Sequence, residues 1–589
     1  MPLDALFVLG LILAVLLSLA ITSISADVIL MSALGVLLIS GILTPQEALV
    51  GFSNTGVMTI AVLYLVAAGL KESGAVQFIA YRLLGQPKTA RQAQGRLLLP
   101  ASLLSAFMNN TAVVAMLIPA VQDWSQRIRI SASKLLLPLS YAAIMGGTLT
   151  LIGTSTNLVV DGLLQQQKGI SLGMFELAWL GVPVLLIGSG FLLVFGDRLL
   201  PSRQGAVEQL DQAREYGVEV EITPGSPLIG KTIAEAGLRS LTYTYLAEIE
   251  RRDTLLSAVE PDTPLEAGDL LFFIGASEGA NELRKINGLQ PASEDVQKLN
   301  MAHHQRHLVE VVLGPDFPAL NKTIRESAFR TRYKAVILSV SREGSRLPGK
   351  LGDIRFQVGD TLLLEAGQTF VDQYRFRRDF LLVSLLNNST PPDFRKAPVA
   401  LAWLAVLILL SATGLLSILE AAFIAAGGML LTRCVTASRG RRAIDLSVLV
   451  VIAASFALGA AMTKTGAAQV LANLLLGGDT GMSPWFALAM VYLMTVIFTE
   501  MITNNAAAVL MFPVAMAVGE QLGVSFMPFA IAIMFAASAS FITPLGYQTN
   551  LMVYGPGGYK MLDYVRIGLP LSLLTGSTAV LLIPFIWSF

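Results

Sequence analysis

A nine-residue pattern, T-x-x-G-x-x-T-N-L, occurs twice in this chain, at residues 150–158 and again at residues 543–551. Each copy lies inside a long apolar stretch, where Gly, Thr and Asn are poor lipid-facing residues. A second pair of polar strings keeps almost the same spacing: Asn109-Asn110-Thr111 and Thr503-Asn504-Asn505. Polar, helix-breaking segments at matching depths in two membrane halves indicate the binding site of a secondary transporter.

Composition independently predicts an integral membrane protein. Of the 589 residues 54% are hydrophobic and 14% charged, and the mean hydropathy is +0.65; a soluble chain carries about a quarter charged residues. Lys+Arg and Asp+Glu balance at 41 each, so net charge points to no nucleic acid or other polyanionic partner. The single Cys434 excludes an intrachain disulfide, and the three histidines, His303, His304 and His307, fall in one polar linker, which argues against a His-ligated metal in the membrane.

Apolar runs of membrane-spanning length form two sets of five. The first set lies near 5–22, 28–44, 57–71, 135–160 and 174–197, and the second lies near 398–416, 419–434, 446–463, 527–554 and 567–588. Between the third and fourth run of each set lies a further apolar stretch, about 97–121 and about 484–518, which the Asn-rich string interrupts. This predicts a re-entrant hairpin, because backbone leaves the helix at that depth only where it lines an enclosed cavity.

The membrane part is therefore predicted to be a duplication of residues 1–200 and 393–589, each half with five spans and one hairpin. Because five is odd, the second half must be inverted. Basic residues gather in loops 71–97 and 122–134 of the first half, but in 433–442 of the second, as inversion requires under the positive-inside rule. This places both termini outside the cell and the region between the halves in the cytoplasm.

That middle region is soluble and also duplicated. Lys231-Thr-Ile233 and Lys322-Thr-Ile324 have the same separation as Gly268-Asp269 and Gly359-Asp360. Alternating apolar runs after each Gly-Asp predict strands. We expect two small α+β domains inserted between the membrane halves.

The polar strings contain no Lys, Arg or His. An anion would be held by hydroxyls, amides and the free N–H groups of half-helix N-termini. Unwound carbonyls and Asn or Thr oxygens suit Na⁺. Bound cations would offset the charge of an anion, so electrostatics favours cation–anion symport.

These residues resemble the divalent anion:sodium symporter (DASS) family of the ion transporter superfamily. That family has two inverted repeats, each with a hairpin carrying a Ser-Asn-Thr tip and a broken helix with a Gly-x-Pro-Pro-Asn loop. The two Asn-rich strings stand at the tips, and Gly153-Thr-Ser-Thr-Asn157 and Gly546-Tyr-Gln-Thr-Asn550 stand at the broken helices. The resemblance implies an elevator-type alternating-access symporter, a homodimer in the lipid bilayer of the inner membrane.

The resemblance also implies site residues. Two Na⁺ sites are expected, one formed by Ser105, Asn109, Asn110, Gly153 and Asn157, and one by Thr499, Thr503, Asn504, Gly546 and Asn550. The substrate anion is expected between Asn110, Thr111, Thr154, Ser155, Asn504, Asn505, Tyr547 and Gln548.

Some positions depart from the family pattern. Asn109 replaces Ser at the first tip, Asn505 replaces Thr at the second, and neither loop has Pro-Pro. The changed tips argue against dicarboxylate specificity, because they are the side chains that read carboxylates.

Residues 206–289 and 307–377 resemble the paired TrkA-C (RCK-C) regulatory domains of potassium-uptake regulators, which implies an unidentified small regulatory ligand. Such an insertion between symporter halves is similar to bacterial, cyanobacterial and algal permeases associated with sulfate. We therefore expect Na⁺-coupled sulfate symport.

Other polar residues have structural interpretations. Ser53-Asn54-Thr55 spells the tip motif but precedes a span, which predicts a helix cap. Lys71, Glu72 and Lys464 lie at span ends, where long charged side chains extend to the interface. Glu500 at the second hairpin has two interpretations: it ties the hairpin to a neighbouring helix, or it couples protons.

Competing functions stay open at this point. The same fold could carry a dicarboxylate or another oxyanion, or use H⁺ instead of Na⁺. A membrane anion sensor is a different class, although no effector domain is evident. An enzyme is not expected, since the chain has no phosphate-binding GxxxxGK[ST] motif and no nucleophile paired with a base.

Overall fold

The computed structural model of the chain carries side chains and forms two compact units. One is helical and comprises Met1–Ser202, Thr390–Tyr554 and Tyr559–Phe589; the other is the insertion Arg203–Ser389 with Gly555–Gly558. The structure describes residues 2–589 except 23, 204–216, 239–240, 242–243, 252–253, 258–261, 276–282, 284–285, 292–306, 343–344, 348–350, 368–369, 375–376, 378, 386–393 and 478–481. His303, His304 and the start of the predicted domain at 206 lie outside the described residues.

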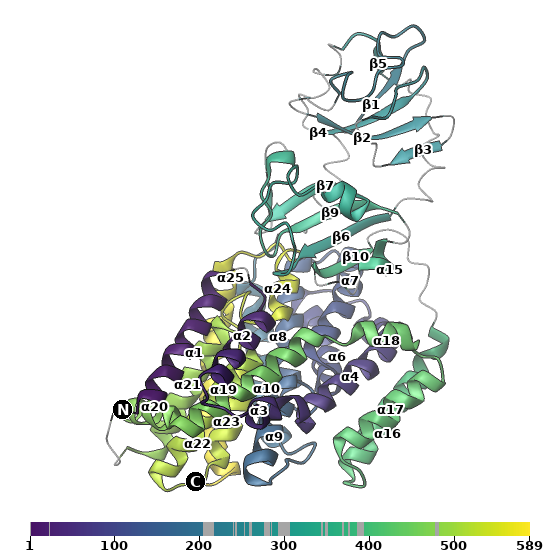
Figure 1. Cartoon of the computed structure of the whole chain (residues 1–589). Helices are drawn as coiled ribbons and strands as arrows, with labels where there is room; N and C mark the ends of the chain where they lie inside the picture. Colours follow the sequence, from purple (N-terminus) through teal and green to yellow (C-terminus); the bar gives the residue numbers. More distant parts are fainter. Residues whose placement is uncertain are drawn as a thin grey trace. The chain divides into compact units, whose positions relative to one another are not determined.

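The two halves of the helical unit contain the same succession of helices (Figure 1). The first half has α1 Leu3–Ile21, α2 Ala26–Ile39, α3 Pro45–Leu49, α4 Thr55–Glu72, α5 Ala75–Leu84, α6 Ala90–Phe107, α7 Asn110–Ile128, α8 Leu136–Gly147, α9 Ser155–Lys168 and α10 Ala178–Leu199. The second has α16 Ala397–Ala412, α17 Ile418–Leu431, α18 Ala437–Ala443, α19 Leu446–Thr465, α20 Ala467–Leu475, α21 Pro484–Met501, α22 Asn504–Leu522, α23 Met527–Ser538, α24 Gln548–Tyr554 and α25 Met561–Ile586.

Corresponding helices also exchange contacts. Helix α2 packs on α19 while α4 packs on α17, and α7 packs on α24 while α9 packs on α22. Glycines with positive φ, Gly74 (68°) and Gly466 (77°), turn the chain at the same place in each half, between α4 and α5 and between α19 and α20. The structure therefore repeats the order and the packing of the two halves, while their opposite orientation in a membrane stays a prediction.

Seven helices among the described residues are long and apolar enough to cross a membrane, or eight if the bent pair Asn110–Ile128 and Ala132–Gly147 is one span. Two of the seven, Pro484–Met501 and Asn504–Leu522, are arms of the predicted second hairpin. The arms of the first hairpin, α6 and α7, extend beyond the predicted 97–121 at both ends. Four predicted spans contain shorter apolar helices instead: Leu3–Leu19, Ala26–Ile39, Ile418–Leu431 and Met527–Ser538.

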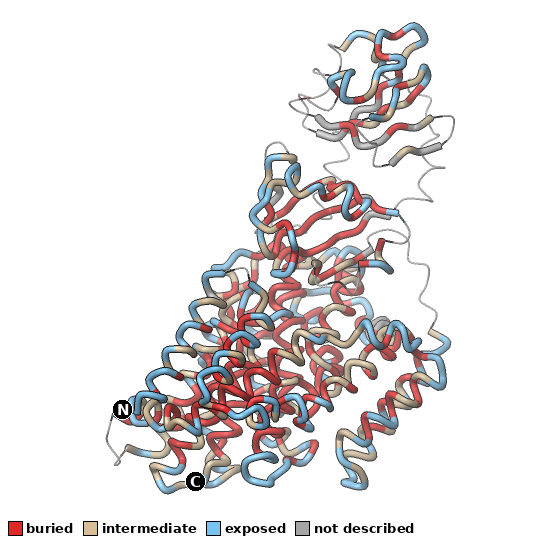
Figure 2. Tube along the Cα trace, viewed as in Figure 1, coloured by how far each residue is buried: buried red, intermediate tan, exposed pale blue. Residues whose placement is uncertain are grey.

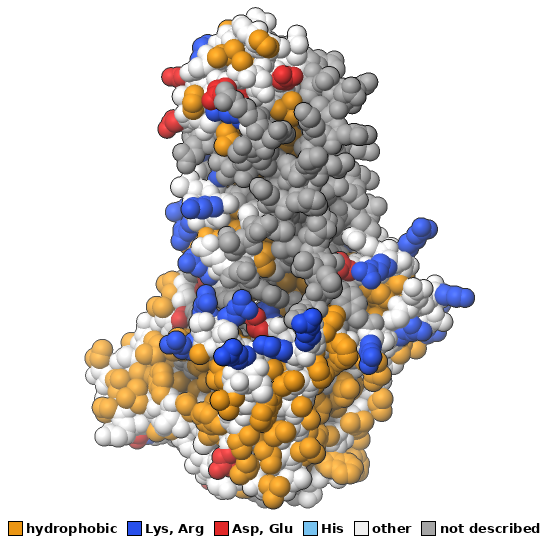
Figure 3. Space-filling view, turned by 90° about the vertical axis from the view of Figure 1, so that its right-hand side faces the viewer, with side chains coloured by type: hydrophobic (Ala, Val, Ile, Leu, Met, Phe, Trp, Pro, Cys, Tyr) orange, Lys and Arg blue, Asp and Glu red, His pale blue; other side chains and the backbone are white. Residues whose placement is uncertain are grey.

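Buried residues run through the middle of the helical unit (Figure 2), and α8 is buried along its whole length. Large apolar side chains cover the outer surface of the helical unit, and a row of Lys and Arg side chains lies along one edge of that surface (Figure 3). Lipid is the environment in which so much exposed apolar surface is stable.

Two of the charged side chains that were predicted to extend to the interface form ion pairs between the halves. Glu72, at the end of α4, forms an ion pair with Arg439 of α18. Lys464, at the end of α19, forms one with Glu47 of α3, at 2.7 Å. Both pairs join the first half to the second.

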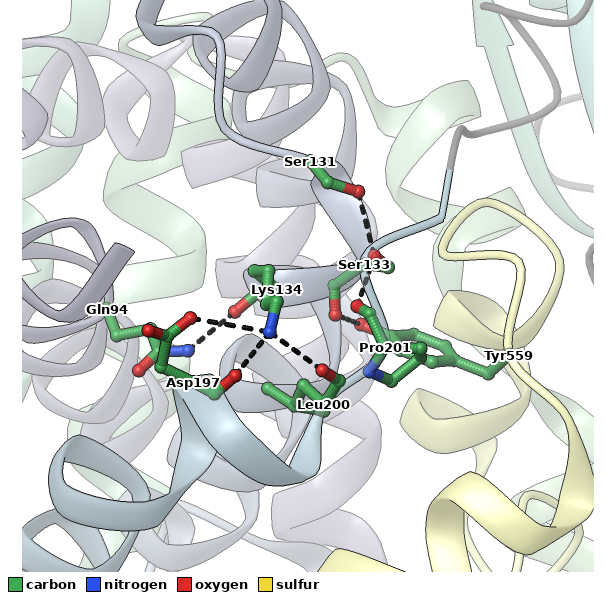
Figure 4. Close-up of polar contacts among 8 residues, drawn as sticks. All are labelled: Gln94, Ser131, Ser133, Lys134, Asp197, Leu200, Pro201 and Tyr559. Carbon is green, nitrogen blue, oxygen red and sulfur yellow. Dashed lines mark hydrogen bonds and ion pairs between the residues drawn. The ribbon is translucent and has the colours of Figure 1, made fainter. Parts of the chain in front are cut away.

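A polar cluster holds the end of α10 (Figure 4). Lys134 Nζ donates to the carbonyls of Asp197 and Leu200, the latter at 2.8 Å, and lies 3.3 Å from the Asp197 carboxylate. Ser133 Oγ donates to the carbonyl of Pro201 at 2.7 Å. A cation at a helix C-terminus stabilises the unpaired carbonyls there, so the exit of the chain toward the insertion is fixed to the turn before α8.

The insertion contains two five-stranded antiparallel sheets of the same strand order, β3-β2-β4-β1-β5 and β8-β7-β9-β6-β10. The strands are β1 Gly217–Ile222, β2 Thr244–Arg251, β3 Thr254–Ser257, β4 Leu270–Gly275, β5 Leu289–Pro291, β6 His307–Leu313, β7 Ala335–Arg342, β8 Ser345–Arg346, β9 Thr361–Ala366 and β10 Phe380–Leu385. The second sheet also carries the short helices α14 Phe329–Tyr333 and α15 Phe370–Tyr374.

The Gly-Asp and Lys-Thr-Ile strings have the same structural role in both sheets. Asp269 and Asp360 are fully buried, and each carboxylate receives two hydrogen bonds from one arginine, Arg251 or Arg342, at 2.7–2.8 Å. In each Lys-Thr-Ile string the threonine exchanges hydrogen bonds with a glutamate three residues later, and the threonine N–H lowers the pKa of that carboxyl. The two strings therefore make the same contacts in both sheets.

Candidate functional site

The two Asn-rich strings each interrupt a pair of helices. Met108 and Asn109 separate α6 from α7, and Ile502 and Thr503 separate α21 from α22. Met108, Ile502 and Thr503 have extended backbone. We call residues 108–111 the first tip and residues 502–505 the second tip. Asn109 Oδ1 accepts the N–H of Thr111 at 3.0 Å and Thr503 Oγ1 accepts that of Ala506 at 3.4 Å, so both side chains cap the helix that follows.

The repeated T-x-x-G-x-x-T-N-L strings form two breaks between helices. We call residues 148–156 the first break; they comprise the segment between α8 and α9 and the first two residues of α9. We call residues 539–548 the second break; they comprise the segment between α23 and α24 and the first residue of α24. Asn157 Nδ2 donates to the carbonyls of Thr150 (3.0 Å) and Gly147 (3.3 Å). Asn550 Nδ2 donates to the carbonyls of Thr543 (3.1 Å) and Ser540 (2.9 Å). The asparagine of each string thus satisfies carbonyls that the broken helix leaves free.

Each tip contacts the break of the other half. Asn110 lies 2.7 Å from the Tyr547 hydroxyl, and Thr111 Oγ1 donates to Gln548 Oε1 at 3.3 Å. In the reciprocal contact Asn505 Oδ1 accepts from Ser155 Oγ at 3.0 Å and from Thr156 Oγ1 at 3.4 Å. The structure therefore brings together strings that are hundreds of residues apart.

The hydroxyl of Tyr547 connects the two halves at the centre of this cluster. It lies 3.3 Å from Thr154 Oγ1 of the first break. The Asn110 amide is best satisfied with Oδ1 accepting from this hydroxyl and Nδ2 donating to Ser105 Oγ, Gly153 O (3.1 Å) and Ala143 O (3.2 Å). Asn110 and Tyr547 are 1% and 8% exposed, so the network is shielded from solvent.

Neutral oxygens converge around Gly153, as a bound Na⁺ would require. A Cβ at Gly153 would meet the carbonyls of Gly147 and Ser105, so only glycine fits this position. Asn157 Oδ1 is buried and has no hydrogen-bond partner among the described residues. A hard monovalent cation takes such oxygen ligands, and the residues present fit one.

Helix α21, which precedes the second tip, contacts that tip, the end of α23 and the second break. Thr499 Oγ1 donates to the Ala537 carbonyl at 2.7 Å and to Asn504 Oδ1 at 3.2 Å. Glu500 accepts the N–H groups of Ile542 (3.0 Å) and Thr543 (3.1 Å). Glu500 thus ties the hairpin to its surroundings, but its partners lie in the unwound second break and not in a neighbouring helix.

Sequence reasoning missed two residues of α8. Ser140 Oγ lies 2.7 Å from Asn550 Oδ1 and 2.9 Å from Thr549 Oγ1, and the Tyr141 hydroxyl donates to the carbonyl of Phe541 at 2.7 Å. They are the only hydroxyl-bearing residues of that helix, which is the signal that could have identified them. They fix the second break to the first half.

A pocket opens beside the first tip. It is lined by Ile60, Leu63, Tyr64, Val66, Ala67, Phe107, Met108, Asn109, Ile152, Ser155 and Leu158. Helix α4 forms one wall, while the tip, the first break and the start of α9 form the other. Asn109 and Ser155 therefore line this pocket together with mostly apolar side chains. Asn54, which belongs to the string that only resembles a tip motif, accepts the N–H of Gly56 at 2.9 Å and caps α4, as predicted.

Comparison with known proteins identifies the family. The model of the citrate transporter family, CitMHS, matches residues 11–525. A protein of Chlamydomonas reinhardtii named as a candidate sulfur deprivation response regulator is 37% identical over 95% of this chain and 97% of its own length. An uncharacterized transporter of Synechocystis is 32% identical over 94% of this chain and 92% of its own.

Sodium/sulfate cotransporter 2 of Chlamydomonas reinhardtii is 28% identical over 90% of this chain and 83% of its own length. The family and the names of these relatives indicate a multi-pass membrane transporter of anions and not an enzyme. The chain belongs to the DASS-related citrate transporter family, CitMHS.

Proposed function

We propose that this protein is a secondary active transporter that carries sulfate together with Na⁺ by alternating access. The observation that carries the proposal is the reciprocal contact of each tip with the break of the other half, around Asn110, Tyr547 and Asn505. Unwound backbone is stable within a membrane protein only where it lines a cavity. Two such segments that meet form the kind of site that secondary transporters use.

The hydrogen-bond donors of the tips and breaks indicate which class of substrate the site can bind. The tips and breaks offer hydroxyls and amides, and no Lys, Arg or His occurs in the strings. A compact tetrahedral oxyanion can be bound by such neutral donors when cations neutralise its charge nearby. The relatives named sodium/sulfate cotransporters support this cargo.

Alternating access by an elevator-type movement is supported by two groups of helices. Helices α6–α10 pack on α21–α25, through α10–α25, α9–α22 and α7–α24. Helices α1–α4 pack on α16–α19, through α2–α19 and α4–α17. The groups meet along α4–α9 and α19–α22, where one could slide against the other. The first group carries both tips and both breaks, so it would carry the cargo, and the second would form the homodimer scaffold.

The two Na⁺ sites would be those predicted, around Gly153 and around Gly546. The inserted domains would face the cytoplasm of a cell whose inner membrane holds the protein, with both termini outside. They would act as TrkA-C-like regulatory domains for an unidentified small ligand.

Uptake of labelled sulfate into proteoliposomes tests the proposal. We expect uptake that requires a Na⁺ gradient and that Asn110→Ala and Asn504→Ala each abolish. Uptake unchanged when choline replaces Na⁺ would reject Na⁺ coupling.

The family name supports a second candidate, a citrate or other carboxylate symporter, which could also be H⁺-coupled. Competition of unlabelled citrate, succinate and sulfate against labelled sulfate separates the candidates. A protein that binds sulfate but moves none into sealed vesicles would instead be a membrane anion sensor.

A further inference from the structure

Among the described residues that hydrogen-bond to the two tips and breaks, Glu500 alone carries a charge. It lies on α21, one residue after Thr499, and is only partly exposed. Its carboxylate accepts two backbone N–H groups of the second break and the hydroxyl of Thr543 at 2.6 Å. Two oxygens of one side chain thus hold the unwound segment open and in register with the second tip.

The first half has no equivalent charge. Ser105 and Thr499 both lie four residues before a tip, so the position matching Glu500 is Ala106. There the hydroxyl of Thr150, the counterpart of Thr543, donates to the backbone carbonyl of Ala106. The threonine has the same role in both halves, but its acceptor is a neutral carbonyl in the first and a carboxylate in the second.

No Lys, Arg or His forms an ion pair with Glu500 among the residues that the structure describes. A carboxylate at membrane depth is costly unless a cation or hydrogen-bond donors compensate it. The N–H groups of Ile542 and Thr543 and the Thr543 hydroxyl compensate the Glu500 carboxylate in part. A cation close by would complete the compensation of its charge.

Further oxygens gather beside this carboxylate. A Cβ at Gly546 would meet Ser540 Oγ, Glu500 Oε2 and Thr543 Oγ1, so all three converge on the open side of that glycine. Ser540 is fully buried, and its hydroxyl lies beside the Glu500 carboxylate. Two hydroxyl oxygens and a carboxylate oxygen that converge on one point form an arrangement that a bound cation would satisfy.

We propose that Glu500 is a positioning residue that holds the second break in its cation-binding form and gives that break a negative charge that the first lacks. The two Na⁺ sites are then unequal, and the one at the second break binds more tightly. This inference rests on the proposed function, because it assumes that Na⁺ is the coupling ion.

Thermal unfolding of the full-length protein in nanodiscs, titrated with NaCl against choline chloride at constant ionic strength, measures cation binding without transport. We expect Na⁺ to raise the Tm of the wild type, and Glu500→Gln to need at least about tenfold more Na⁺ for half of the effect. Glu420→Gln makes the same chemical change in the same half, at the start of α17, and should follow the wild-type curve.

A Glu500→Gln curve that superimposes on the wild type would overturn the proposal. If that variant does not fold, Thr543→Val removes the hydroxyl that donates to Glu500 and accepts the Gly546 N–H, and it leaves the carboxylate in place. A weaker shift in the same direction supports the proposal, and an unchanged curve overturns it. A wild type with no Na⁺-dependent Tm would reject Na⁺ coupling itself, which distinguishes the two failures.

Discussion

Replacing Tyr547 by phenylalanine removes one oxygen atom from the contact between the two halves. The hydroxyl lies 2.7 Å from the Asn110 amide and 3.3 Å from Thr154 Oγ1, and both partners are at most 2% exposed. The ring remains, so packing around it is preserved. The Asn110 amide oxygen loses its partner in a place that water does not reach.

Leaving a buried acceptor unsatisfied costs about 1–3 kcal/mol. At 1.4 kcal/mol for each factor of ten, this corresponds to a loss of about 5- to 150-fold in the stability of the assembled site. We therefore expect Tyr547→Phe to raise the KM for sulfate at least about fivefold in proteoliposomes.

Tyr559→Phe is the matched control, because Tyr559 is also buried and its hydroxyl donates to the Ser133 carbonyl at 2.6 Å (Figure 4). The same hydroxyl accepts the Leu137 N–H at 2.8 Å. Both variants should lower the Tm. Only Tyr547→Phe should change the KM, since Tyr559 touches neither tip. Equal KM values for both variants and the wild type would refute the reasoning.

Three further predictions test the packing around the site. Asn157→Ala removes the amide that bridges the carbonyls of the first break, and we expect Na⁺-dependent uptake to fall at least about tenfold while expression is retained. Glu72→Arg should lower the Tm by placing two cations together, and adding Arg439→Glu should restore it, although a half-exposed pair contributes only about 0.2–1 kcal/mol; a double variant no better than the single would contradict the pairing. Arg342→Met strands the buried Asp360 carboxylate and should cost the inserted domain about 3–5 kcal/mol in denaturant unfolding, whereas replacing both residues by apolar ones should recover most of the loss.

Sequence reasoning located the helix breaks because they are local. The two string pairs contain glycine, asparagine and threonine, whose backbone preferences and side-chain oxygens act within a few residues. Asn54 could be recognised as a cap for the same reason, since an N-cap bonds within the first turn. The family resemblance implied that the strings of both halves lie close together, whereas the reciprocal contacts of each tip with the break of the other half were not predicted.

Contacts that break the symmetry could not be predicted in this way. Ser140 and Tyr141 reach the second break from a helix with no polar pattern, and Ile533 stands where the second half would need a serine equivalent to Ser140. Helix length was also poorly predicted, because the hairpin arms continue as helices past the apolar run that marks them. Hydropathy reports the lipid-facing part of a helix, not where its hydrogen bonds end.

The two ion pairs between the halves favour the packing of the first half on the second. Glu47 and Arg439 occupy corresponding positions 392 residues apart, and so do Glu72 and Lys464. Contacts cross over, so that Glu72 meets Arg439 and Lys464 meets Glu47. A first half packed on a copy of itself would place two glutamates together, and a second half would place two cations together. Exposed pairs contribute little to stability, but like charges penalise the wrong partner. The charge pattern therefore selects the pairing of the first half with the second over the pairing of either half with itself.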